Sequence, residues 1–549
     1  MVLKKYYFKE LLVCIILILL SFLLLYPFSN SRAILLQGDE EMHIATVRES
    51  IKTHQYLFPV LENYMNLYKP PLLFWLGIGI SNFFKEMLYP ERLISIIIYI
   101  LNILVFYSSL RVSKIDVKHA ILFSLLFLSS LAVFKFSRLF MIESLMSLGT
   151  FIITTLLLIY NLKKSIFSLI ISGLITGLFV LAKGPLFIVY TGILFLSFSF
   201  VKIFTLNNNF FWTGKKRIWS ELKNGFLLLG ISILVPFLWA FILYFYTNTG
   251  KDFLYFFIIN ENLGKFSSNT INQSGWILLF GLIIYTYPST FFLLNNLNSF
   301  KKKKSNRLIL IYSKALFFGS LVMILIHFLP NRKDAYYVIP VIPILFFSNG
   351  VLFFNLNNTD QISLLIKGIY SVFFFLFLQI ISLFLFNYYF NKNFYLEILS
   401  IFILIILFLF FKLKLKSKSQ YFNLFILISI LVITHLQFRI LPSISLEDLP
   451  VNSTLKEEKN ICVISENPWD GLIYKNLLRT SDVIHTLPSR EDICINKKYT
   501  LLFYRTIPNN QSIKKNYFLK ETWHLWKKNI SINHLFDKDK VLIYKLKKE

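Results

Sequence analysis

The feature that most constrains this chain is a series of long apolar segments without any charged side chain. The first, Leu11 to Ser31, is longer than the ~18 residues that mark a membrane-spanning helix. Over the whole chain 56% of residues are hydrophobic and 16% are charged, whereas soluble proteins average about 25% charged residues. These values exclude a disordered chain, a coiled coil, a disulfide scaffold and an ordinary soluble enzyme. The sequence predicts an all-α polytopic membrane protein.

The distribution of basic residues indicates how the chain crosses the membrane. The formal net charge is +28, and such an excess of Lys and Arg in a membrane protein is typical of cytoplasmic loops facing anionic lipid. No basic motif interleaved with aromatic residues is present, so we expect no nucleic-acid partner. Lys4, Lys5 and Lys9 precede the first apolar segment, and no small-residue cleavage site follows it. We therefore predict an uncleaved signal anchor with a cytoplasmic N-terminus.

The apolar segments predict about thirteen membrane spans. If the spans alternate, nearly every basic cluster falls in a cytoplasmic loop, and only loop 356–363 lacks one. The short apolar segment Pro71 to Phe84 is predicted to form a helix in or at the membrane interface rather than a span. An odd number of spans places the C-terminus outside the cytoplasm. The predicted spans are 11–31, 93–110, 119–136, 144–162, 166–182, 185–203, 225–246, 274–296, 313–329, 337–355, 366–389, 395–411 and 421–438.

The composition changes near residue 440 and predicts two domains. Residues 1–440 form the membrane domain, in which 28–92 make the first outer loop, and residues 441–549 form a small extracytoplasmic α/β domain with short β-like segments. Three cysteines are present without a metal-ligand spacing. Cys462 and Cys494 each lie in a β-like segment, and we predict a disulfide between them. Two buried thiols are the alternative.

Charged residues of the first outer loop are candidates for a functional site. Asp39, Glu40 and Glu41 precede Arg48 and Glu49, and interleaved apolar residues predict an amphipathic helix along the membrane surface. The alternative is an acidic first turn that only stabilises the start of that helix.

Further charges lie where outer loops re-enter the membrane. Glu143 is a second acid at such a boundary, and the alternative is a salt bridge with Arg138. Lys183 and the stretch Pro330 to Tyr337 supply cations at two more boundaries, where the alternative is snorkelling of lysines to lipid headgroups. Two acids and several cations on one face predict a site for an anionic, membrane-embedded substrate.

The order of these motifs resembles the bacterial aminoarabinose–lipid A transferase (ArnT-like) family. That family belongs to the protein-mannosyltransferase-like (PMT) group, which has the GT-C glycosyltransferase fold. The first loop matches the family pattern of Asp39-Glu40, then Arg48-Glu49, then Pro59 and Lys69-Pro70. The resemblance continues through Arg138 to Glu143, Lys183-Gly184, Asn260-Glu261-Asn262, Lys265-Phe266 and Lys333 to Pro340, and it includes an outer C-terminal domain.

The resemblance implies a hexosyl- or pentosyltransferase of the cell envelope. It implies a polyprenyl-phosphate sugar donor and a lipid or glycan acceptor, such as lipid A, at the periplasmic face of the inner membrane. Asp39 and Glu143 match the family's catalytic acids, and Lys69 and Lys333 match cations that meet the donor phosphate. We add Arg332 to the phosphate-binding set because of its charge. The predicted substrate-binding residues are Glu40, Arg138, Lys183, Glu261 and Tyr337.

Elementary chemistry agrees with this reaction class. Lys69, Arg332 or Lys333 can neutralise the departing phosphate, and Asp39 can deprotonate an acceptor hydroxyl. Direct displacement by the acceptor predicts inversion at the sugar carbon. We expect no required metal cofactor because these cations can serve, and a divalent cation is the alternative.

Two departures from the family pattern leave the sugar and the acceptor open. Met42 and Tyr68 stand where the aminoarabinose transferases carry Arg and Glu. The nearest alternative function is a protein O-glycosyltransferase of the same fold. The alternative from another class is a flippase or transporter for a lipid-linked sugar. Transporters place charged sites near mid-membrane and often contain inverted repeats, whereas here the charges gather in outer loops and no repeat is visible.

Overall fold

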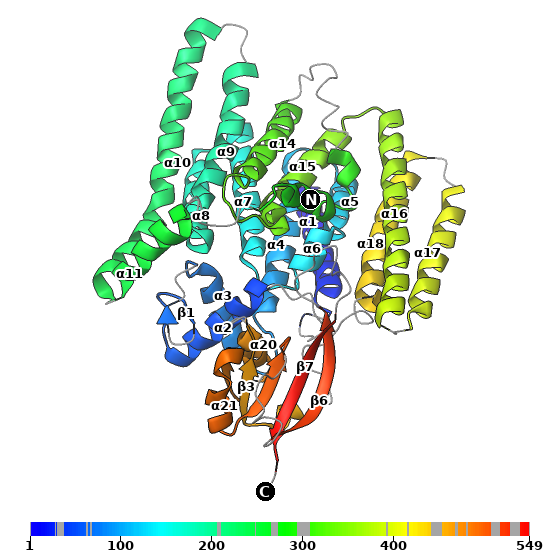
Figure 1. Cartoon of the computed structure of the whole chain (residues 1–549). Coiled ribbons are helices and arrows are strands. Elements are labelled where there is room, and N and C mark those ends of the chain that lie inside the picture. The colour runs from blue at the N-terminus through cyan, green and yellow to red at the C-terminus, as the bar shows by residue number, and fades with distance from the viewer. Residues whose placement is uncertain are drawn as a thin grey trace.

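Apolar α-helices make up the membrane part of the computed structural model (Figure 1). In the part of the chain that the structure describes, ten helices are long and apolar enough to cross a membrane, as predicted for a multi-pass protein. Three other predicted spans coincide with the shorter apolar helices Val117–Leu128, Trp276–Tyr285 and Tyr395–Leu407, so the count of thirteen stays a prediction.

The structure describes most of the chain. Among the predicted features, Tyr68, Lys265, Phe266 and the basic loop 301–304 lie outside the described residues. The described residues are 2–27, 29, 38–61, 64–65, 69–205, 210–247, 249–264, 273–293, 308–390, 393–413, 417–440, 453–466, 470–478, 481–506, 517–526 and 538–547.

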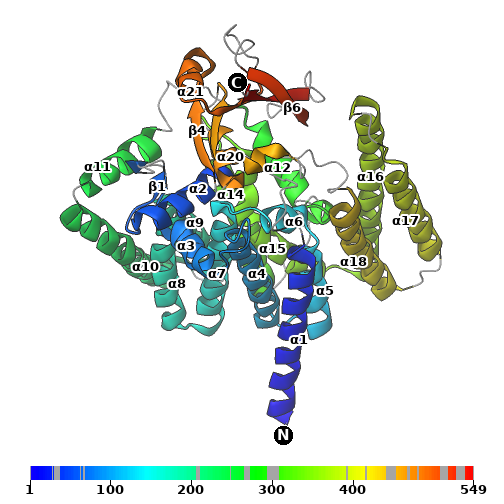
Figure 2. The same cartoon turned by 90° about the horizontal axis from the view of Figure 1, so that it is seen from below.

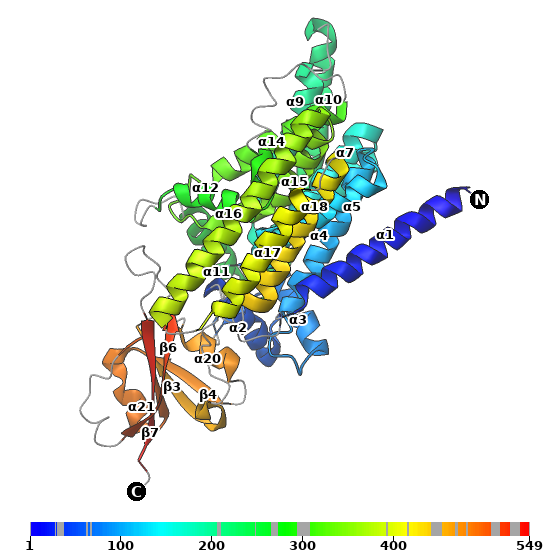
Figure 3. The same ribbon diagram turned by 90° about the vertical axis from the view of Figure 1, so that its right-hand side faces the viewer.

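Most of the long helices run along the bundle, and α1 diverges from it (Figures 1 and 3). A 3₁₀ helix, Ala335–Val341, leads directly into α15, and a π-helical segment, Phe256–Leu263, follows α11. The helices of the bundle are α1 (Val2–Leu25), α4 (Arg92–Val112), α5 (Val117–Leu128), α6 (Leu131–Phe136), α7 (Ile142–Lys163), α8 (Ile166–Lys183), α9 (Leu186–Phe200), α10 (Phe210–Tyr246), α11 (Gly250–Tyr255), α12 (Trp276–Tyr285), α14 (Leu308–Ile326), α15 (Ile342–Phe353), α16 (Asn358–Phe390), α17 (Tyr395–Leu413) and α18 (Lys418–His435).

Side chains of helices at the centre of the bundle are buried by neighbouring helices, whereas those at its edge are partly exposed. Every residue of α15 is buried, as expected for a helix that is apolar on all sides and enclosed by others. At the edge, α10 exposes Phe226, Phe237 and Phe245, which are suited to contact lipid tails.

Small residues allow α8 and α10 to approach closely. A Cβ atom added at Gly173 would lie 2.8 Å from the Ile231 side chain, and one added at Gly177 would lie 2.7 Å from the Ser232 carbonyl oxygen. In a bilayer, van der Waals packing between small residues four positions apart is a main source of helix association. These two glycines therefore fix the contact between the two helices.

The first loop folds as predicted into helices outside the long bundle helices. The predicted amphipathic helix is α2 (Gly38–Thr53), and the short apolar segment forms α3 (Leu72–Phe83). Between them lies a small hairpin of β1 (Val60–Leu61) and β2 (Tyr64–Met65).

The predicted segment 119–136 is interrupted rather than continuous. It divides into α5 and α6 at Ser129 and Ser130. The Ser130 hydroxyl accepts a hydrogen bond from the Val133 backbone N–H. This hydrogen bond caps the N-terminus of α6. The segment therefore forms two helices instead of one continuous helix.

The C-terminal domain is a mixed five-stranded sheet in the order β4-β3-β5-β7-β6. Strand β3 is parallel to β4 and β5, whereas β7 is antiparallel to β5 and β6. The membrane part is described to residue 440, and the predicted domain boundary falls in the gap before residue 453. The elements are β3 (Asn460–Ile464), α20 (Asp470–Leu477), β4 (Asp482–Thr486), α21 (Asp492–Asn496), β5 (Thr500–Tyr504), β6 (Tyr517–Trp526) and β7 (Lys538–Leu546).

The two cysteines of this domain form a disulfide, as predicted. Cys462 lies on β3 and Cys494 on α21, with 6.1 Å between their Cα atoms. The prediction that Cys494 lies in a strand is wrong. The short segment around it, Asp492–Asn496, is helical, and its buried Cys494 side chain belongs to the domain core, against which Ile495 also packs.

The C-terminal domain packs against the first-loop helices. Leu472 of α20 is buried together with Met42 and Ala45 of α2. The N-terminus of α1 lies on the opposite side of the molecule from this domain (Figures 2 and 3). This arrangement places α2 between the membrane helices and the C-terminal domain.

Candidate active site

Asp39 lies in the first turn of α2 and faces the segment before α15. The Tyr336 hydroxyl is 3.1 Å from Asp39 Oδ2, and Arg332 Nη2 is 3.7 Å from Asp39 Oδ1. Asp334 contacts the same two groups, with its Oδ2 3.2 Å from Arg332 Nε and 3.1 Å from the Tyr336 hydroxyl. Two carboxylates from different segments therefore share one guanidinium and one phenol.

The electrostatic surroundings keep Asp39 ionised. Burial raises the pKa of its carboxyl, but favourable interactions with His43, Arg332 and Lys69, together with the Tyr336 hydrogen bond, lower it below its usual value. About a third of the Asp39 side chain is exposed (33%). Asp39 is thus an ionised carboxylate that a ligand can reach.

Glu143 forms a second acidic centre in the first turn of α7. Lys183 Nζ donates to Glu143 Oε1 at 2.6 Å. The alternative in which Arg138 pairs with Glu143 is therefore wrong. The side chain of Glu143 is 5% exposed and that of Lys183 is 17% exposed, so Lys183 is paired inside the protein and does not snorkel to headgroups.

Helix ends explain why this ion pair forms. Glu143 lies at the N-terminus of α7 and Lys183 at the C-terminus of α8, where the helix dipoles favour a negative and a positive charge respectively. Gly184 ends α8 with φ +77°, and a Cβ there would lie 2.8 Å from Phe257. A residue without Cβ is required at this turn.

Two consecutive tyrosines connect the acidic centres. Tyr336 contacts Asp39, and the ring of Tyr337 lies edge-on to that of Tyr336 with 5.2 Å between centroids. Lys183 Nζ lies 4.7 Å from the centre of the Tyr337 ring. A chain of direct contacts therefore leads from Asp39 through both tyrosines to Lys183 and Glu143.

The remaining predicted cations lie close to this chain of contacts. Lys69 precedes α3, and its Nζ lies 3.5 Å from Glu261 Oε1. Lys333 is buried, and its backbone N–H donates to Gln273 Oε1 at 2.6 Å. Its burial is incompatible with snorkelling to lipid headgroups. Lys69 and Glu261, far apart in sequence, meet in the structure.

Glu40 has partners that hold the framework together. Arg92 Nε and Nη2 donate to the two Glu40 carboxylate oxygens at 2.8 and 2.9 Å, and the Phe140 N–H donates to Oε1 at 2.8 Å. Neither side chain is more than 3% exposed. Glu40 thus joins α2 to α4 and to the connection before α7, and a contact with substrate would require breaking this pair.

Arg138 is also engaged by the framework. It donates to the Leu24 carbonyl oxygen at 2.8 Å and to Gln437 Oε1 at 2.7 Å, and to the Phe134 carbonyl oxygen. These contacts connect it to α1 and to the π-helical segment Leu436–Ile440 that follows α18. The side chains of Glu40 and Arg138 are therefore both engaged in holding helices together. The proposal below assigns neither of them a contact with substrate.

His43 is a site residue that the sequence analysis missed. Its ring is buried against Phe74 and Phe140, and Nδ1 donates to the Phe140 carbonyl oxygen at 3.1 Å. Burial lowers the pKa of this imidazole despite the nearby Asp39, and Nε2 has no hydrogen-bond partner among the described residues. Its spacing of four residues from Asp39 was the available signal, because such residues share a helix face.

Within the segments that the structure describes, no group of three or more His, Cys, Asp or Glu side chains gathers in a way that could hold a metal ion. The predicted independence from metal is untested by this geometry and stays a prediction.

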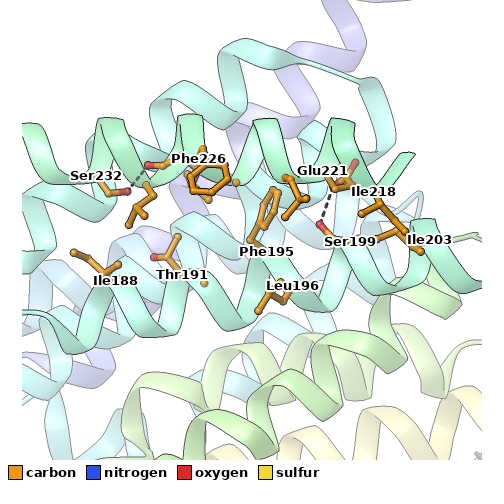
Figure 4. A pocket seen from close by; sticks show the side chains of 15 residues that line it. Ile188, Thr191, Phe195, Leu196, Ser199, Ile203, Ile218, Glu221, Phe226 and Ser232 are labelled. Carbon is orange, nitrogen blue, oxygen red and sulfur yellow. Dashed lines mark hydrogen bonds between the residues drawn. The ribbon is translucent and has the colours of Figure 1, made fainter. Parts of the chain in front are cut away.

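An apolar cavity lies between α9 and α10 (Figure 4). Its volume is about 340 Å³. Ile188 lines one end, two residues into α9, and Phe195 lies in the middle. At the other end Ser199 donates to Glu221 at 2.7 Å. The cavity begins five residues after Lys183 and follows the membrane helices away from the ion pair.

The structure is similar to two crystal structures of ArnT from Cupriavidus metallidurans. The apo form superposes with a TM-score of 0.66 at 13% sequence identity, covering 96% of this chain and 97% of that chain. The form bound to undecaprenyl phosphate has a TM-score of 0.63 with the same identity and coverage. No family model matches the sequence, and no curated protein matches it. The fold predicted from the motif resemblance, an ArnT-like GT-C fold, is confirmed.

Proposed function

We propose, on the premise that this chain has an ArnT-like GT-C fold, that it is an integral-membrane glycosyltransferase. It would move a sugar from a polyprenyl phosphate to an acceptor on the side of the membrane where the C-terminal domain lies, which we assign to the periplasmic face. The observation that carries this proposal is the contact chain from Asp39 through Tyr336 and Tyr337 to Lys183 and Glu143, with Arg332 at its start. The similar ArnT structure with undecaprenyl phosphate supports a polyprenyl phosphate as the lipid.

The proposed chemistry is a direct displacement at the anomeric carbon. The acceptor oxygen forms a bond to that carbon while the bond to the donor phosphate oxygen breaks, and polyprenyl phosphate departs. Asp39 takes the proton of an acceptor hydroxyl. Lys69, Arg332 and Lys333 are the cations that would neutralise the phosphate as its charge develops. This geometry inverts the configuration of the sugar carbon.

Glu143 is the proposed contact for the sugar. Its Oε1 accepts from Lys183, and its Oε2 has no hydrogen-bond partner among the described residues although it is buried. A buried carboxylate oxygen without a partner is energetically costly, and a sugar hydroxyl or amino group can satisfy it. Lys183 and Tyr337 would hold this carboxylate in place, and Glu261 would orient Lys69.

The apolar cavity between α9 and α10 is the proposed place for part of the polyprenyl tail. A Cβ at Gly192, which lines the cavity, has no atom within 4 Å, so the side chain of Gly192→Leu starts in open space and takes up volume there. The excluded tail stays in the hydrocarbon of the bilayer, so it loses only van der Waals contacts of about 0.1–0.2 kcal/mol each with the cavity walls. A loss of roughly ten such contacts should raise the KM for a long-chain donor about tenfold. Gly230→Leu is the matched control, since Gly230 lies on α10 outside the cavity and also has no atom within 4 Å.

A short-chain donor provides the second arm of this experiment. If the cavity holds the tail, Gly192→Leu should leave the KM for a donor too short to reach it unchanged. Equal effects of both glycine variants, or equal effects on both donors, would contradict the assignment of the tail to this cavity.

Transfer itself is tested with the full chain in lipid nanodiscs and with cells that lack the gene. Mass spectrometry of lipid A, glycans and glycoproteins should show one sugar missing without the gene. The purified protein should release polyprenyl phosphate only when acceptor is present. If the glycans lose no sugar, or if the purified protein moves the donor across the bilayer without transfer, the flippase alternative replaces this proposal. Loss of the sugar from protein alone would favour the protein O-glycosyltransferase.

A further inference from the structure

The connection between α6 and α7 is a buried loop that leads to Glu143. Leu139, Phe140 and Met141 are fully buried, so their backbone N–H and C=O groups need partners within the protein. Helix α7 begins after Met141, and no side-chain hydrogen bond caps its start. The position of Glu143 in the first turn of α7 therefore depends on the contacts that hold this loop.

Helix α2 holds both backbone polar groups of Phe140. The Phe140 N–H donates to Glu40 Oε1 at 2.8 Å, and the Phe140 carbonyl oxygen accepts from His43 Nδ1 at 3.1 Å. Both side chains belong to the helix whose first turn carries Asp39. The two hydrogen bonds therefore link the helix of the proposed base to a residue that lies three positions before the second acid, Glu143.

The surroundings of the His43 ring fix the direction of its N–H group. The ring lies edge-on to Phe74 of α3, with 5.8 Å between centroids, and edge-on to Phe140, with 6.4 Å between centroids. A Cβ added at Gly77 would lie 2.7 Å from Phe140 Cζ, so α3 packs closely against Phe140. Because a carbonyl oxygen can only accept, Nδ1 carries the proton. Nε2 has no hydrogen-bond partner among the described residues, and the bond from Nδ1 is thus the polar contact that can be assigned to this ring.

A further contact holds the same loop from a different helix. The Ser95 hydroxyl, on α4, donates to the Leu139 carbonyl oxygen at 2.6 Å. This bond attaches the loop to the bundle but not to α2. Breaking it leaves both bonds between α2 and Phe140 in place, so Ser95 provides a matched control for His43.

We propose that His43 is a positioning residue, which sets the separation of Asp39 and Glu143 by holding the Phe140 carbonyl oxygen. A buried carbonyl oxygen without a donor is energetically costly, so loss of the His43 N–H favours a shift of the loop toward another donor. A misplacement of about 1 Å can lower a rate by roughly 10²-fold. This inference rests on the proposed function, because it assumes that both acids act on one substrate.

The first experiment compares three substitutions of His43 in the full chain in nanodiscs. His43→Asn has an amide N–H group where the imidazole has Nδ1, so it keeps a donor to Phe140. His43→Gln has its amide further from the backbone, near the place of Nε2, and His43→Leu has no donor. For release of polyprenyl phosphate in the presence of acceptor, kcat should fall about a hundredfold in His43→Gln and His43→Leu. It should stay within about tenfold of wild type in His43→Asn and in the control Ser95→Ala.

Hydrogen exchange read by mass spectrometry tests the loop independently of the reaction. Peptides that cover residues 137–144 should exchange faster in His43→Leu and His43→Gln than in the wild type and in His43→Asn. Binding of undecaprenyl phosphate should be the same in all of these variants, because the cations proposed to bind it are unchanged. If His43→Leu does not fold, the comparison of His43→Asn with His43→Gln decides the question.

Four results would overturn this inference. They are wild-type kcat in His43→Gln and His43→Leu, unchanged exchange of the loop in these variants, a loss in Ser95→Ala as large as that in His43→Leu, and equal losses in His43→Asn and His43→Leu. The last would indicate that Nε2, rather than the bond to Phe140, is the group that matters. If the wild type transfers no sugar while exchange follows the expected pattern, the proposed function fails and the role of His43 in holding the loop stands.

Discussion

Replacing Asp39 by Asn provides the sharpest test of the proposed mechanism, because the structure offers a matched control. Asp39 and Asp334 contact the same Arg332 guanidinium and the same Tyr336 hydroxyl, at similar distances. Both side chains are partly exposed, at 33% and 24%. Asp39→Asn and Asp334→Asn therefore each remove one negative charge from the same cluster. Only Asp39 stands at the start of α2 and would act as the base.

The expected magnitudes separate the two roles. A charge pair near 4 Å contributes about 1 kcal/mol in water and about 4 kcal/mol near a protein surface, and each variant loses one such contact with Arg332. A general base contributes roughly 10²–10⁴-fold to the rate, or about 3–5 kcal/mol of activation free energy. We therefore expect kcat of Asp39→Asn to fall by that further factor below kcat of Asp334→Asn.

The assay measures release of polyprenyl phosphate by the full chain in nanodiscs, with a hydroxyl acceptor. Binding of undecaprenyl phosphate by both variants establishes that the site is folded. If the two variants lose the same activity, Asp39 only balances the charge of Arg332 and is not the base. If Asp39→Asn retains wild-type kcat, the proposed mechanism is refuted.

Four further predictions follow from the same structure. Thiol labelling of the denatured, unreduced protein should modify Cys14 alone, and Ser at both Cys462 and Cys494 should lower the melting temperature of the C-terminal domain by removing about 3–4 kcal/mol; three labelled thiols would exclude the disulfide. A reporter inserted after Lys164 should be cytoplasmic and one fused to the C-terminus extracytoplasmic, and the reverse at either point would refute the alternating spans. The pKa of Asp39 is lowered, so its carboxylate becomes protonated only as the pH falls below the ordinary value of ~3.9. A plot of kcat against pH should therefore show no decrease caused by this group between pH 5 and 8. Transfer should persist in EDTA, and a loss that Mg²⁺ restores would establish a metal requirement.

Hydropathy was sufficient to predict the membrane part from sequence. A run such as Leu11 to Ser31 cannot be accommodated in a soluble core, and its backbone can satisfy its hydrogen bonds in lipid only as a helix. Polar interruptions were harder to judge, because Ser129 and Ser130 are tolerated within an apolar segment and yet divide it into two helices. The region that we propose as the site was also selected from sequence, since charges such as Asp39 and Glu143 at a membrane boundary are costly without a role.

The partner of each charged residue was decided by the tertiary structure. Sequence proximity favoured Arg138 for Glu143, but the ends of α7 and α8 bring Lys183, forty residues away, to 2.6 Å. Glu40 likewise pairs with Arg92 across 52 positions. Such pairings depend on how helices cross and where they end, and hydropathy along one helix contains no information about its neighbours. The sequence by itself therefore determined which segments enter the membrane and which charges stay at its boundary, while helix packing decided which charges bind one another and which carboxylate oxygens remain for a ligand.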